Sequence, residues 1–402
     1  MNAERRSRDS ISTQVVIVGA GPAGLLLGHL LHRAGIASVI LERRDRRHAE
    51  ERIRAGVLEQ GTIDTLDEAG VGGRMHREGL AHDGIELLFG GRRHRIDLKA
   101  LSGGRAILVY GQHEVVKDLI AVRIDAGLPL FFDVSDVALH GIDGDRPAVS
   151  YVRDGTTQCI DCDYIAGCDG FHGVSRPSIP DGVLKIFERV YPFAWLGILA
   201  EAAPSLHELV YASHERGFAL FSMRSEKITR LYLQCAPDEA LAEWSDARIW
   251  QELHRRLACD DGWKPNEGPI VQKGITPMRS FVAEPMQFGR LFLAGDAAHI
   301  VPPTGAKGMN LAVADVRALS KAMIAHYAGE GDAKLADYSA TCLKRVWRAE
   351  HYSWWMTSML HRFPDNTPFM DRIQRAELEY VTSSEAGGRV LAENYAGLPF
   401  AD

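Results

Sequence analysis

Residues 14–24 of the chain read QVVIVGAGPAG. The β-branched run before the first glycine is typical of a buried parallel strand. The apolar residues 25–31 that follow Gly24 continue as a helix, which we expect to end near Gly35. Residues 38–42, SVILE, then return as a second strand that ends in Glu42. The sequence therefore predicts a βαβ unit near the start of the chain.

The glycines of this unit have the G-x-G-x-x-G spacing of a dinucleotide-binding loop, with an acid about 20 residues further on. Gly19 permits the tight turn, Gly21 lets the backbone approach a pyrophosphate at the helix N-terminus, and Gly24 lets helix and strand pack closely. Glu42 can accept hydrogen bonds from a ribose. A tight turn with no ligand is the alternative, but strand, helix and acid together favour a dinucleotide.

A second loop decides between FAD and NAD, which the first motif does not distinguish. Residues 291–299, LFLAGDAAH, place Asp296 at the end of a buried strand, where ligands of such sheets gather. Residues 301–310, VPPTGAKGMN, form a Gly/Pro-rich loop that opens a helix over residues 309–327. Asp296 can bind ribityl hydroxyls, and the helix N-terminus can meet the electron-rich O2 edge of a flavin. We therefore expect FAD.

Composition excludes several classes of protein. The chain has 402 residues, a formal charge of −7, 46% hydrophobic and 25% charged residues, which is ordinary for a soluble globular protein. Domains of about 100–200 residues make two intertwined domains or three small ones the expectation. The negative charge argues against a nucleic-acid partner. A membrane span is not expected, because the sequence contains no run of about 18 apolar residues. The charged first 13 residues lack a secretory signal, and residues 1–10 read as a loose tail.

Cysteine usage favours a reducing cytoplasm, because six cysteines are sparse for this length. Cys159 and Cys162 have a Cys-x-x-Cys spacing, but only Cys168 follows nearby and no second pair completes four zinc ligands. Alternating residues of a strand explain them better, and we expect no metal site.

The later chain changes character twice. Between residues 185 and 273, β-rich segments alternate with turns, which indicates an inserted and largely antiparallel sheet. After residue 327 the chain is mainly helical, with aromatic residues that could line a domain or subunit interface. These residues are Trp347, Tyr352, Trp354, Trp355 and Phe363.

Further segments carry a family resemblance. Cys168-Asp169-Gly170 is followed by Ser175-Arg176, and with the two glycine-rich loops this pattern resembles the flavoprotein aromatic hydroxylases. Segments 52–61, 162–176, 190–196, 217–220, 354–358 and 361–364 are similar to the members that act on 4-hydroxybenzoate. The similarity runs from Gln14 to Tyr395, which makes it far more specific than one motif. Two positions depart from the family, because Ala23 and Gly173 stand where serine is found.

The resemblance implies an α/β fold, with a Rossmann-like FAD-binding domain of the glutathione-reductase type, an inserted β-sheet substrate domain and a helical C-terminal region. It also implies a homodimer. The expected divisions are a flexible tail (1–10), the first part of the FAD-binding domain (11–184, with some substrate-domain strands near 80–110), a mainly β substrate-binding domain (185–273), the second part of the FAD-binding domain (274–326) and a helical interface region (327–402).

Motif and resemblance together give a set of FAD-binding positions. Within it the resemblance implies Glu42 on the adenosine ribose and Arg54 on the pyrophosphate. The set is Gly19, Gly21, Gly24, Glu42, Arg52, Arg54, Val57, Gln112, Asp169, Arg230, Asp296, Met309 and Asn310.

The substrate site needs a cation for a carboxylate and a hydrogen-bond partner for a phenol. Arg224 offers a planar fork, and Ser222 offers a hydroxyl on the same strand face. The resemblance assigns both, with Tyr232, to the carboxylate, and Tyr211 to the phenolic oxygen. The implied substrate-binding residues are Tyr211, Ser222, Met223, Arg224, Tyr232, Pro303 and Tyr395.

The resemblance also implies a proton relay from Tyr211 through Tyr395 to His82, with Pro303 and Thr304 nearby as further catalytic residues. Two phenols passing a proton to an imidazole suits this chemistry, because histidine has a pKa of about 6.5 and exchanges protons near neutrality. From its neighbours alone, His82 reads as a surface histidine, and Tyr395 as an unremarked aromatic residue.

The implied activity is hydroxylation of 4-hydroxybenzoate at C3 to 3,4-dihydroxybenzoate, in aromatic catabolism. A nicotinamide reduces FAD, and O2 then forms a flavin C4a-hydroperoxide that attacks the phenolate. Arg230 and the Pro303 region would keep water out. Two alternatives stay open. One is a hydroxylase of a related 3-hydroxy or 3,4-dihydroxy benzoate, and the other is a non-enzymatic binding protein on the same fold, like the prenyl-GTPase carriers.

No second complete G-x-G-x-x-G unit is present for the nicotinamide, so a surface site is expected. Residues 43–48 correspond to the helix that governs the preference for a 2′-phosphate, and their four arginines favour NADPH. A solvated basic face is the alternative, and NADH stays open because the segment departs from the common family pattern. The nicotinamide-binding residues implied are Arg43, Arg44, Arg54, His172 and Arg279.

Overall fold

The computed structural model describes residues 11–51 and 56–400. A six-stranded sheet forms the base of the nucleotide-binding region, in the order β19 (Gln287–Phe288), β20 (Leu291–Leu293), β13 (Tyr164–Gly167), β2 (Val15–Val18), β3 (Ser38–Leu41) and β9 (Leu130–Phe131). All neighbours from β20 to β9 are parallel. β2, β3 and β13 are buried along their whole length, which explains their unbroken apolar sequences.

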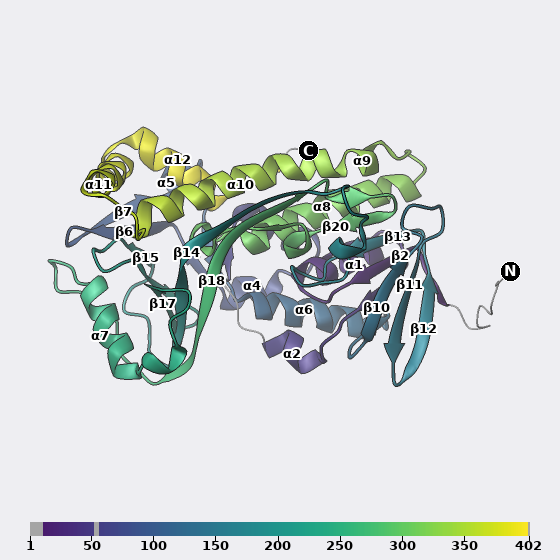
Figure 1. Cartoon of the computed structure of the whole chain (residues 1–402), viewed down its shortest axis with the longest axis horizontal. Helices are drawn as coiled ribbons and strands as arrows, with labels where there is room; N and C mark the ends of the chain where they lie inside the picture. The colour runs from purple at the N-terminus through teal and green to yellow at the C-terminus, as the bar shows by residue number, and fades with distance from the viewer. Residues whose placement is uncertain (1–10, 52–55, 401–402) are drawn as a thin grey trace.

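Helices cover this sheet, and a second small sheet flanks it (Figure 1). α1 (Pro22–Arg33) packs against α8 (Gly308–Tyr327) and α6 (Gln112–Asp125). The flanking sheet has the order β1 (Ile11–Ser12), β12 (Thr156–Asp161), β11 (Ala148–Arg153) and β10 (Ser135–His140). Residues of β11 and β12 belong to the same apolar core as β2 and α1. The predicted βαβ unit is therefore β2–α1–β3, with Gly35 in the left-handed region at φ 76°.

An eight-stranded sheet forms the other half of the molecule. Its order is β21 (His299–Ile300), β18 (Ile270–Glu284), β14 (Lys185–Ala200), β17 (Thr229–Cys235), β16 (Ala219–Met223), β15 (Leu209–Ala212), β6 (Gly84–Phe89) and β7 (Arg92–Asp97). Only β15 and β6 pair in parallel. β14 and β18 pair along almost their whole length, and Figure 1 shows that these two strands join the halves of the molecule.

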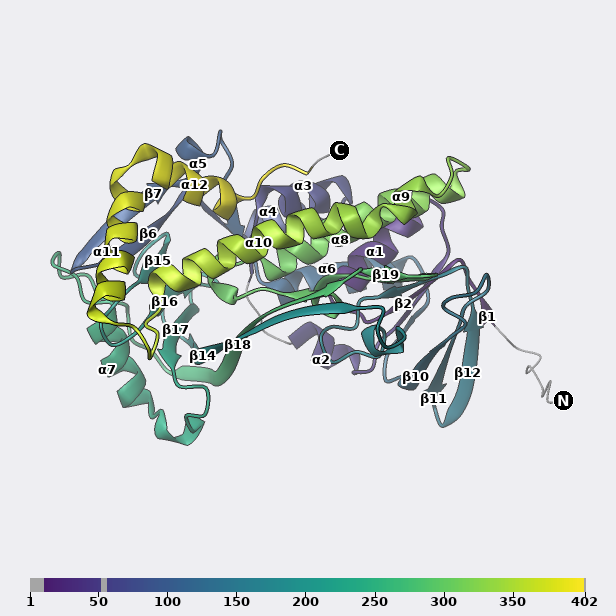
Figure 2. The same ribbon diagram turned by 45° about the horizontal axis from the view of Figure 1, so that its top comes forward.

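The two faces of the eight-stranded sheet bury different partners. One face packs against α7 (Asp246–Arg256), whose Ile249 and Leu253 join its core. The other face turns toward α10 (Tyr338–Leu360), α11 (Pro368–Ser383) and α12 (Glu385–Ala396). The helices α5 (Leu98–Leu101) and α9 (Ala333–Ala336) are short. In Figures 1 and 2, α10 runs along the long axis from one half to the other.

A separate three-stranded sheet has the order β4 (Val57–Leu58), β8 (Ile107–Val109) and β5 (Leu80–His82). The helices α2 (Arg46–Glu51), α3 (Gln60–Glu68) and α4 (Gly73–Glu78) accompany it. Cys159 lies exposed in β12, whereas Cys162 is buried just beyond that strand. Over the described chain, no helix combines the length and the apolar character that crossing a bilayer requires. The tail expected over residues 1–10 lies outside the described residues.

Candidate active site

The glycine-rich loop between β2 and α1 meets three different steric demands. Gly19 has a φ of 105°, in the left-handed region, and an added Cβ would lie 2.4 Å from the Cys168 carbonyl oxygen. A Cβ on Gly24 would lie 2.0 Å from the Gly19 carbonyl oxygen, so α1 packs directly on the loop. At Gly21, in contrast, an added Cβ would meet no atom within 4 Å. The loop thus leaves open space where its backbone would face a pyrophosphate.

Glu42, at the end of β3, holds this loop in place. One carboxylate oxygen accepts the Ala20 amide at 2.8 Å, and the other accepts the Arg44 amide at 2.9 Å. Each oxygen keeps a further lone pair, so the same carboxylate can accept a ribose hydroxyl. The first turn of α1 carries no acidic side chain, which leaves the positive end of the helix dipole available to an anion.

A second helix N-terminus stands at α8, behind a short turn, η4 (Pro303–Gly305). The first α-helical hydrogen bond of α8 runs from the Leu311 amide to the Lys307 carbonyl, so the amides of Met309 and Asn310 precede it. The Asn310 side chain is fully used inside the protein, because it donates to Val57 and Ala306 and accepts from the residue 59 amide and the residue 62 hydroxyl. Asn310 would therefore contact a flavin through its backbone.

Beneath this helix end lies a buried ion pair that the sequence reasoning did not single out. The Lys307 ammonium lies 2.5 Å from a Glu59 carboxylate oxygen and donates to the Tyr395 carbonyl at 3.1 Å. Burial lowers the pKa of Lys307, which Glu59 partly opposes. The pair joins residues 248 positions apart, and nothing in the sequence around either residue signals their contact.

Asp169 follows β13 and lies beside the glycine-rich loop between β2 and α1. One of its carboxylate oxygens accepts the amide and the hydroxyl of Ser175, at 2.8 and 2.9 Å, and within the described residues the other oxygen has no partner. Burial raises the pKa of this carboxyl. An added Cβ on Gly173 would lie 2.0 Å from the Asp169 side chain, so Asp169 here fills the space that a side chain at position 173 would need.

These observations fit an FAD molecule. Two helix ends with free amides, open space at Gly21 and an unpartnered Asp169 oxygen all suit a long ligand with a pyrophosphate. Asp296 lies half-buried after β20 in η3 (Gly295–Ala297), and Gln112 begins α6. Val57 lies in β4 beside α8. Arg52 and Arg54, also expected at the cofactor, lie outside the described residues.

The residues expected at the phenol come together from distant parts of the chain. The Tyr211 hydroxyl on β15 lies 2.6 Å from the Tyr395 hydroxyl on α12, and both rings are buried. Burial raises the pKa of Tyr211 and of Tyr395. The Thr304 hydroxyl lies 2.8 Å from that of Thr357 on α10.

The residues expected at the carboxylate lie at the far end of β16 and β17. The Ser222 hydroxyl donates to the Arg230 carbonyl at 2.8 Å, and an Arg224 nitrogen donates to the Met223 carbonyl at 2.8 Å. Burial disfavours the ionised form of Tyr232, but the neighbouring Arg230 and Arg224 outweigh it and lower the Tyr232 pKa. In the described part of the chain no carboxylate pairs with either guanidinium, and both keep buried nitrogens without a partner.

Comparison with known proteins shows the family of the chain. A family model described as an FAD binding domain matches residues 12–353. The p-hydroxybenzoate hydroxylase of Acinetobacter baylyi is 51% identical over 391 residues, which cover 97% of this chain and 96% of that protein. The chain belongs to the flavoprotein aromatic hydroxylases.

More distant relatives share the fold of this hydroxylase. A 3-(3-hydroxy-phenyl)propionate/3-hydroxycinnamic acid hydroxylase of Mycobacterium sp. (strain JLS) is 26% identical over 343 residues, 82% of this chain and 57% of that protein. The crystal structure of p-nitrophenol 4-monooxygenase PnpA from Pseudomonas putida DLL-E4 aligns with a TM-score of 0.82 at 20% identity. That alignment covers 97% of this chain and 100% of the other.

His82 of the hydroxylase is buried, with 1% of its surface exposed, so the surface position suggested by its neighbours in the sequence is wrong. It ends β5, and strand alternation turns it inward between the exposed Ala81 and Asp83. Among the described residues its ring nitrogens have no hydrogen-bond partner. Burial lowers the pKa of His82 to about 4. No direct hydrogen bond between Tyr395 and His82 is formed in the described structure, so a relay to His82 needs a bridging water or a movement.

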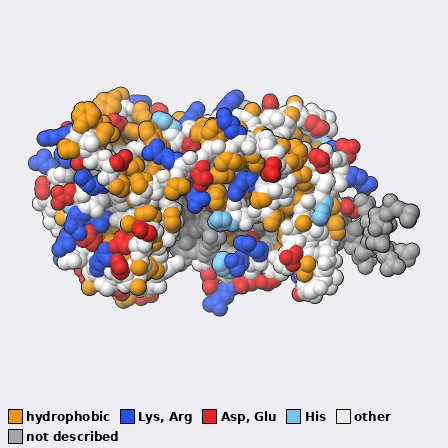
Figure 3. Space-filling view, in the orientation of Figure 1, with side chains coloured by type: hydrophobic (Ala, Val, Ile, Leu, Met, Phe, Trp, Pro, Cys, Tyr) orange, Lys and Arg blue, Asp and Glu red, His pale blue; other side chains and the backbone are white. Residues whose placement is uncertain are grey.

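The residues expected at the nicotinamide lie in two places. His172 is exposed, with its ring 4.9 Å from that of Phe171, and the Arg279 guanidinium lies 4.8 Å from the same Phe171 ring. Arg43 and Arg44 are exposed before α2. In Figure 3, basic and histidine side chains border the hollow near the middle of this face.

The basic run at residues 43–47 carries less free charge than its sequence suggests. Arg46 pairs with Glu50 at 2.6 Å and Arg47 with Glu51 at 2.9 Å, each along one turn of α2. Two of the four arginines therefore already face a carboxylate, and only Arg43 and Arg44 of the run have no such helical partner. The structure thus weakens, without removing, the charge-based preference for a 2′-phosphate.

The hydroxylase also buries three titratable groups, which are His299, Asp315 and Glu350. The His299 ring lies 2.7 Å from an Asp315 oxygen, and the same oxygen accepts the Gly295 amide at 2.9 Å. Burial opposes a charged His299, but Asp315 outweighs it and raises the pKa of the ring. Glu350 on α10 is 5% exposed, and burial raises its pKa to about 7, with Ser280 and His299 opposing.

Replacing Glu350 by Gln should make the protein less sensitive to alkaline pH. The folded state binds the Glu350 proton more tightly than the unfolded state, so native stability falls as pH rises from about 4.5 through 7. A shift of this size corresponds to roughly 3 kcal/mol. Urea unfolding should therefore show the variant gaining stability relative to the native protein between pH 5 and pH 8. The exposed Glu379→Gln control should show no such trend, and an equal trend in both variants would contradict the assignment.

Proposed function

We propose that this hydroxylase converts 4-hydroxybenzoate to 3,4-dihydroxybenzoate. One atom of O2 enters the ring at C3 and the other leaves as water, and a nicotinamide supplies the two electrons with a proton from solvent. The observation that carries the substrate assignment is the pair of guanidinium groups, Arg224 and Arg230, that no described carboxylate neutralises. A buried cationic site of this kind recognises a carboxylate, which a planar guanidinium can bind through two parallel hydrogen bonds.

Tyr211 and Tyr395 have the chemistry to bind the other end of the ring. Their 2.6 Å contact leaves each oxygen able to make one further hydrogen bond, so Tyr211 can hold a phenol and pass its proton on to Tyr395. A phenolate is a better carbon nucleophile at the ortho position than a phenol. Removing the proton therefore activates C3.

Bound FAD, once reduced by the nicotinamide, would supply the activated oxygen. Gly19–Gly24, Glu42, Asp169 and Asp296 would hold it, with the amides of Met309 and Asn310 at the flavin ring. The turn η4 stands between that helix end and the aromatic residues of the sheet. Its Thr304 is fully buried, which supports a role in excluding water.

The test is a turnover assay on the purified, FAD-loaded protein. Nicotinamide oxidation and product formation would be followed with 4-hydroxybenzoate, 3-hydroxybenzoate, 3,4-dihydroxybenzoate and 4-hydroxybenzamide. The proposal expects one product per nicotinamide only with 4-hydroxybenzoate. If the protein binds no FAD, it is instead a non-enzymatic carrier on this fold. If turnover is coupled with another of these compounds, that compound is the substrate in place of 4-hydroxybenzoate.

NADPH is the proposed reductant, because Arg43 and Arg44 remain for a 2′-phosphate. His172 and Arg279, which both contact the Phe171 ring, would contact the dinucleotide elsewhere. The ratio of kcat/KM for NADPH and NADH measures this preference, and a ratio below one would assign NADH. A reducing cytoplasm is the proposed location, because six cysteines are sparse for a chain of this length.

A homodimer is the proposed assembly, because α11 leaves one side uncovered. Phe369, Met370, Ile373 and Tyr380 are 70%, 44%, 48% and 54% exposed, at spacings that put the first, third and fourth on one helical face. Only Leu378 and Val381 of this helix are buried. A second copy of the chain would cover this stripe by two-fold symmetry.

Phe369→Glu combined with Ile373→Glu should therefore convert the dimer to a monomer. Two carboxylates in a small apolar interface are left without partners, which costs more than such a contact supplies. Analytical ultracentrifugation at micromolar protein measures the change. Val271→Glu, at a half-exposed position on β18, should leave the dimer intact. A native protein that sediments as a monomer would contradict the proposal.

A further inference from the structure

Helix α10 touches both the sheet that carries the substrate residues and the turn beside the flavin. It packs against α8, η4 and β18, and its C-terminal end reaches the face of the eight-stranded sheet that contains Tyr211. Both ribbon views show it spanning the two halves (Figures 1 and 2). A single rigid element therefore has direct contact with each of the two parts that the reaction must hold together.

The end of α10 is hydrogen-bonded to the sheet through a histidine. The Trp195 indole nitrogen on β14 donates to His361 Nε2 at 2.7 Å. Because an indole N–H only donates, Nε2 is an acceptor and the neutral ring carries its proton on Nδ1, which lies 3.1 Å from the Thr357 carbonyl. Burial lowers the pKa of His361 to about 3, and the ring stacks on Phe193 and Phe218 at centroid distances of 4.7 and 4.3 Å.

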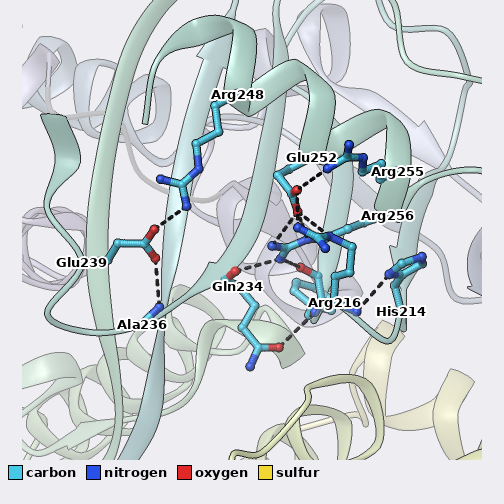
Figure 4. Close-up of polar contacts among 10 residues, drawn as sticks. His214, Arg216, Gln234, Ala236, Glu239, Arg248, Glu252, Arg255 and Arg256 are labelled. Carbon is cyan, nitrogen blue, oxygen red and sulfur yellow. Dashed lines mark hydrogen bonds and ion pairs between the residues drawn. The ribbon is translucent and has the colours of Figure 1, made fainter. Parts of the chain in front are cut away.

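A second side chain fixes the residue after this histidine. Gln234 on β17 donates to the Arg362 carbonyl at 2.6 Å and accepts the Arg362 amide at 3.1 Å. The same Gln234 oxygen accepts the Phe218 amide at 3.0 Å. In Figure 4, Gln234 lies beside the Arg216–Glu252–Arg256 cluster, and Arg256 donates to the Gln234 carbonyl at 2.8 Å. The chain leaving α10 is thus tied to two strands.

One helical turn before His361, α10 is hydrogen-bonded to η4, the turn beside the expected flavin site. The Thr357 hydroxyl lies 2.7 Å from the Ser353 carbonyl and 2.8 Å from the Thr304 hydroxyl. Thr357 is the donor in both contacts, so its single hydroxyl proton is shared between the Ser353 carbonyl and the Thr304 hydroxyl. An added Cβ on Gly305 would lie 2.6 Å from the Ser353 hydroxyl oxygen, so the turn presses directly on the helix. The residues of this contact are all fully buried.

We propose that Thr357 and His361 are positioning residues that let the substrate sheet fix the turn Pro303–Gly305. Trp195 and Gln234 hold the end of α10 on the sheet, and Thr357 holds the turn on α10. The Thr304 hydroxyl accepts a hydrogen bond from the helix, so α10 fixes the position of Thr304 and of its turn. Only the expected effect on the coupling of nicotinamide oxidation to product formation rests on the proposed hydroxylation.

The test is a double-mutant cycle read by two methods. Thr304→Val and Thr357→Val each remove one hydroxyl, and the double variant removes both. Amide hydrogen exchange of the FAD-loaded protein without substrate should speed up about fivefold to tenfold in peptides covering residues 301–309 in each single variant, as expected for one lost hydrogen bond. The double variant should match the single variants in these peptides, because the same bond between the turn and α10 is lost in all three. The additional Thr357–Ser353 bond that is lost with Thr357 lies within α10 and outside these peptides. In turnover, the share of nicotinamide spent on peroxide should rise several-fold.

Matched variants separate positioning from general damage. Thr341→Val makes the same change at an exposed site on α10 and should leave exchange and coupling as in the native protein. Thr357→Ser keeps a hydroxyl and should also behave like the native protein. If Thr357→Val does not fold, Trp195→Phe removes the indole donor together with part of the ring and should shift the same peptides by a smaller factor. Additive effects of the two valines, or unchanged exchange at 301–309, would overturn the proposal. Because exchange needs no substrate, a shifted exchange with no hydroxylation would refute the proposed function alone.

Discussion

Replacing Tyr211 by Phe is expected to lower the rate of hydroxylation by a factor on the order of 10²–10³, as for the loss of a positioned proton acceptor. Binding of 4-hydroxybenzoate should weaken by about tenfold or less, because only one neutral hydrogen bond is lost. The expectation follows from the 2.6 Å contact between the Tyr211 and Tyr395 hydroxyls in a buried site. With Phe at 211, no hydroxyl connects the substrate phenol to Tyr395, and the ring stays a poor nucleophile.

Product formation and nicotinamide oxidation should be measured separately. The variant should still oxidise the nicotinamide when substrate is bound, and most of the electrons should appear as peroxide. Tyr191→Phe is the matched control, since this tyrosine is also buried on the same sheet and its hydroxyl lies 3.3 Å from that of Ser280, on a different strand. Coupled turnover of Tyr211→Phe at the native rate would remove Tyr211 from the mechanism.

Local sequence predicted the nucleotide-binding half well, because the interactions that shape it are local. Gly19 is favoured by its φ of 105°, Gly24 is required because an added Cβ would lie 2.0 Å from the Gly19 carbonyl oxygen, and β2 and β3 are short runs buried along their whole length. Such demands act within about 30 residues and leave a readable pattern. The inserted antiparallel sheet could also be anticipated from its alternation of strands and turns.

The catalytic geometry could not be read in this way. Tyr211 and Tyr395 are 184 positions apart, and Lys307 and Glu59 are 248 apart. Nothing in the flanking residues of either pair signals the contact, and family resemblance alone brought the two tyrosines forward. His82 shows the opposite error, because polar neighbours on a short strand suggested exposure while the pleat turned the ring inward.

The eight-stranded sheet explains why these distant residues meet. Strand β6, from early in the chain, pairs with β15, and β14 and β18 continue from the substrate residues back toward the flavin turn. The helices α10 and α12 then bring Thr357 and Tyr395 onto the same face. A site built from one sheet and two later helices is fixed by tertiary packing, which a single segment of sequence does not reveal.

Arg224→Met should weaken binding of 4-hydroxybenzoate by roughly 30- to 1,000-fold, the range for losing one partner of a buried charge pair. Methionine keeps much of the length and apolar volume of the side chain but offers no donor. The native guanidinium has a buried nitrogen without a partner in the described structure, so it is prepared to bind an anion. Titration of the flavin absorbance of the FAD-loaded protein gives the Kd without any need for turnover.

The neutral analogue 4-hydroxybenzamide completes a cycle with this variant. It carries the same ring and phenol but no charge, so its Kd should change by about tenfold or less on Arg224→Met. Arg189→Met, at an exposed position of β14, should change neither Kd and thereby controls for the loss of one positive charge. If the acid and the amide lost affinity equally, Arg224 would be supporting the fold of the β16–β17 connection. The carboxylate would then have to bind elsewhere, and Arg230 would be the remaining candidate.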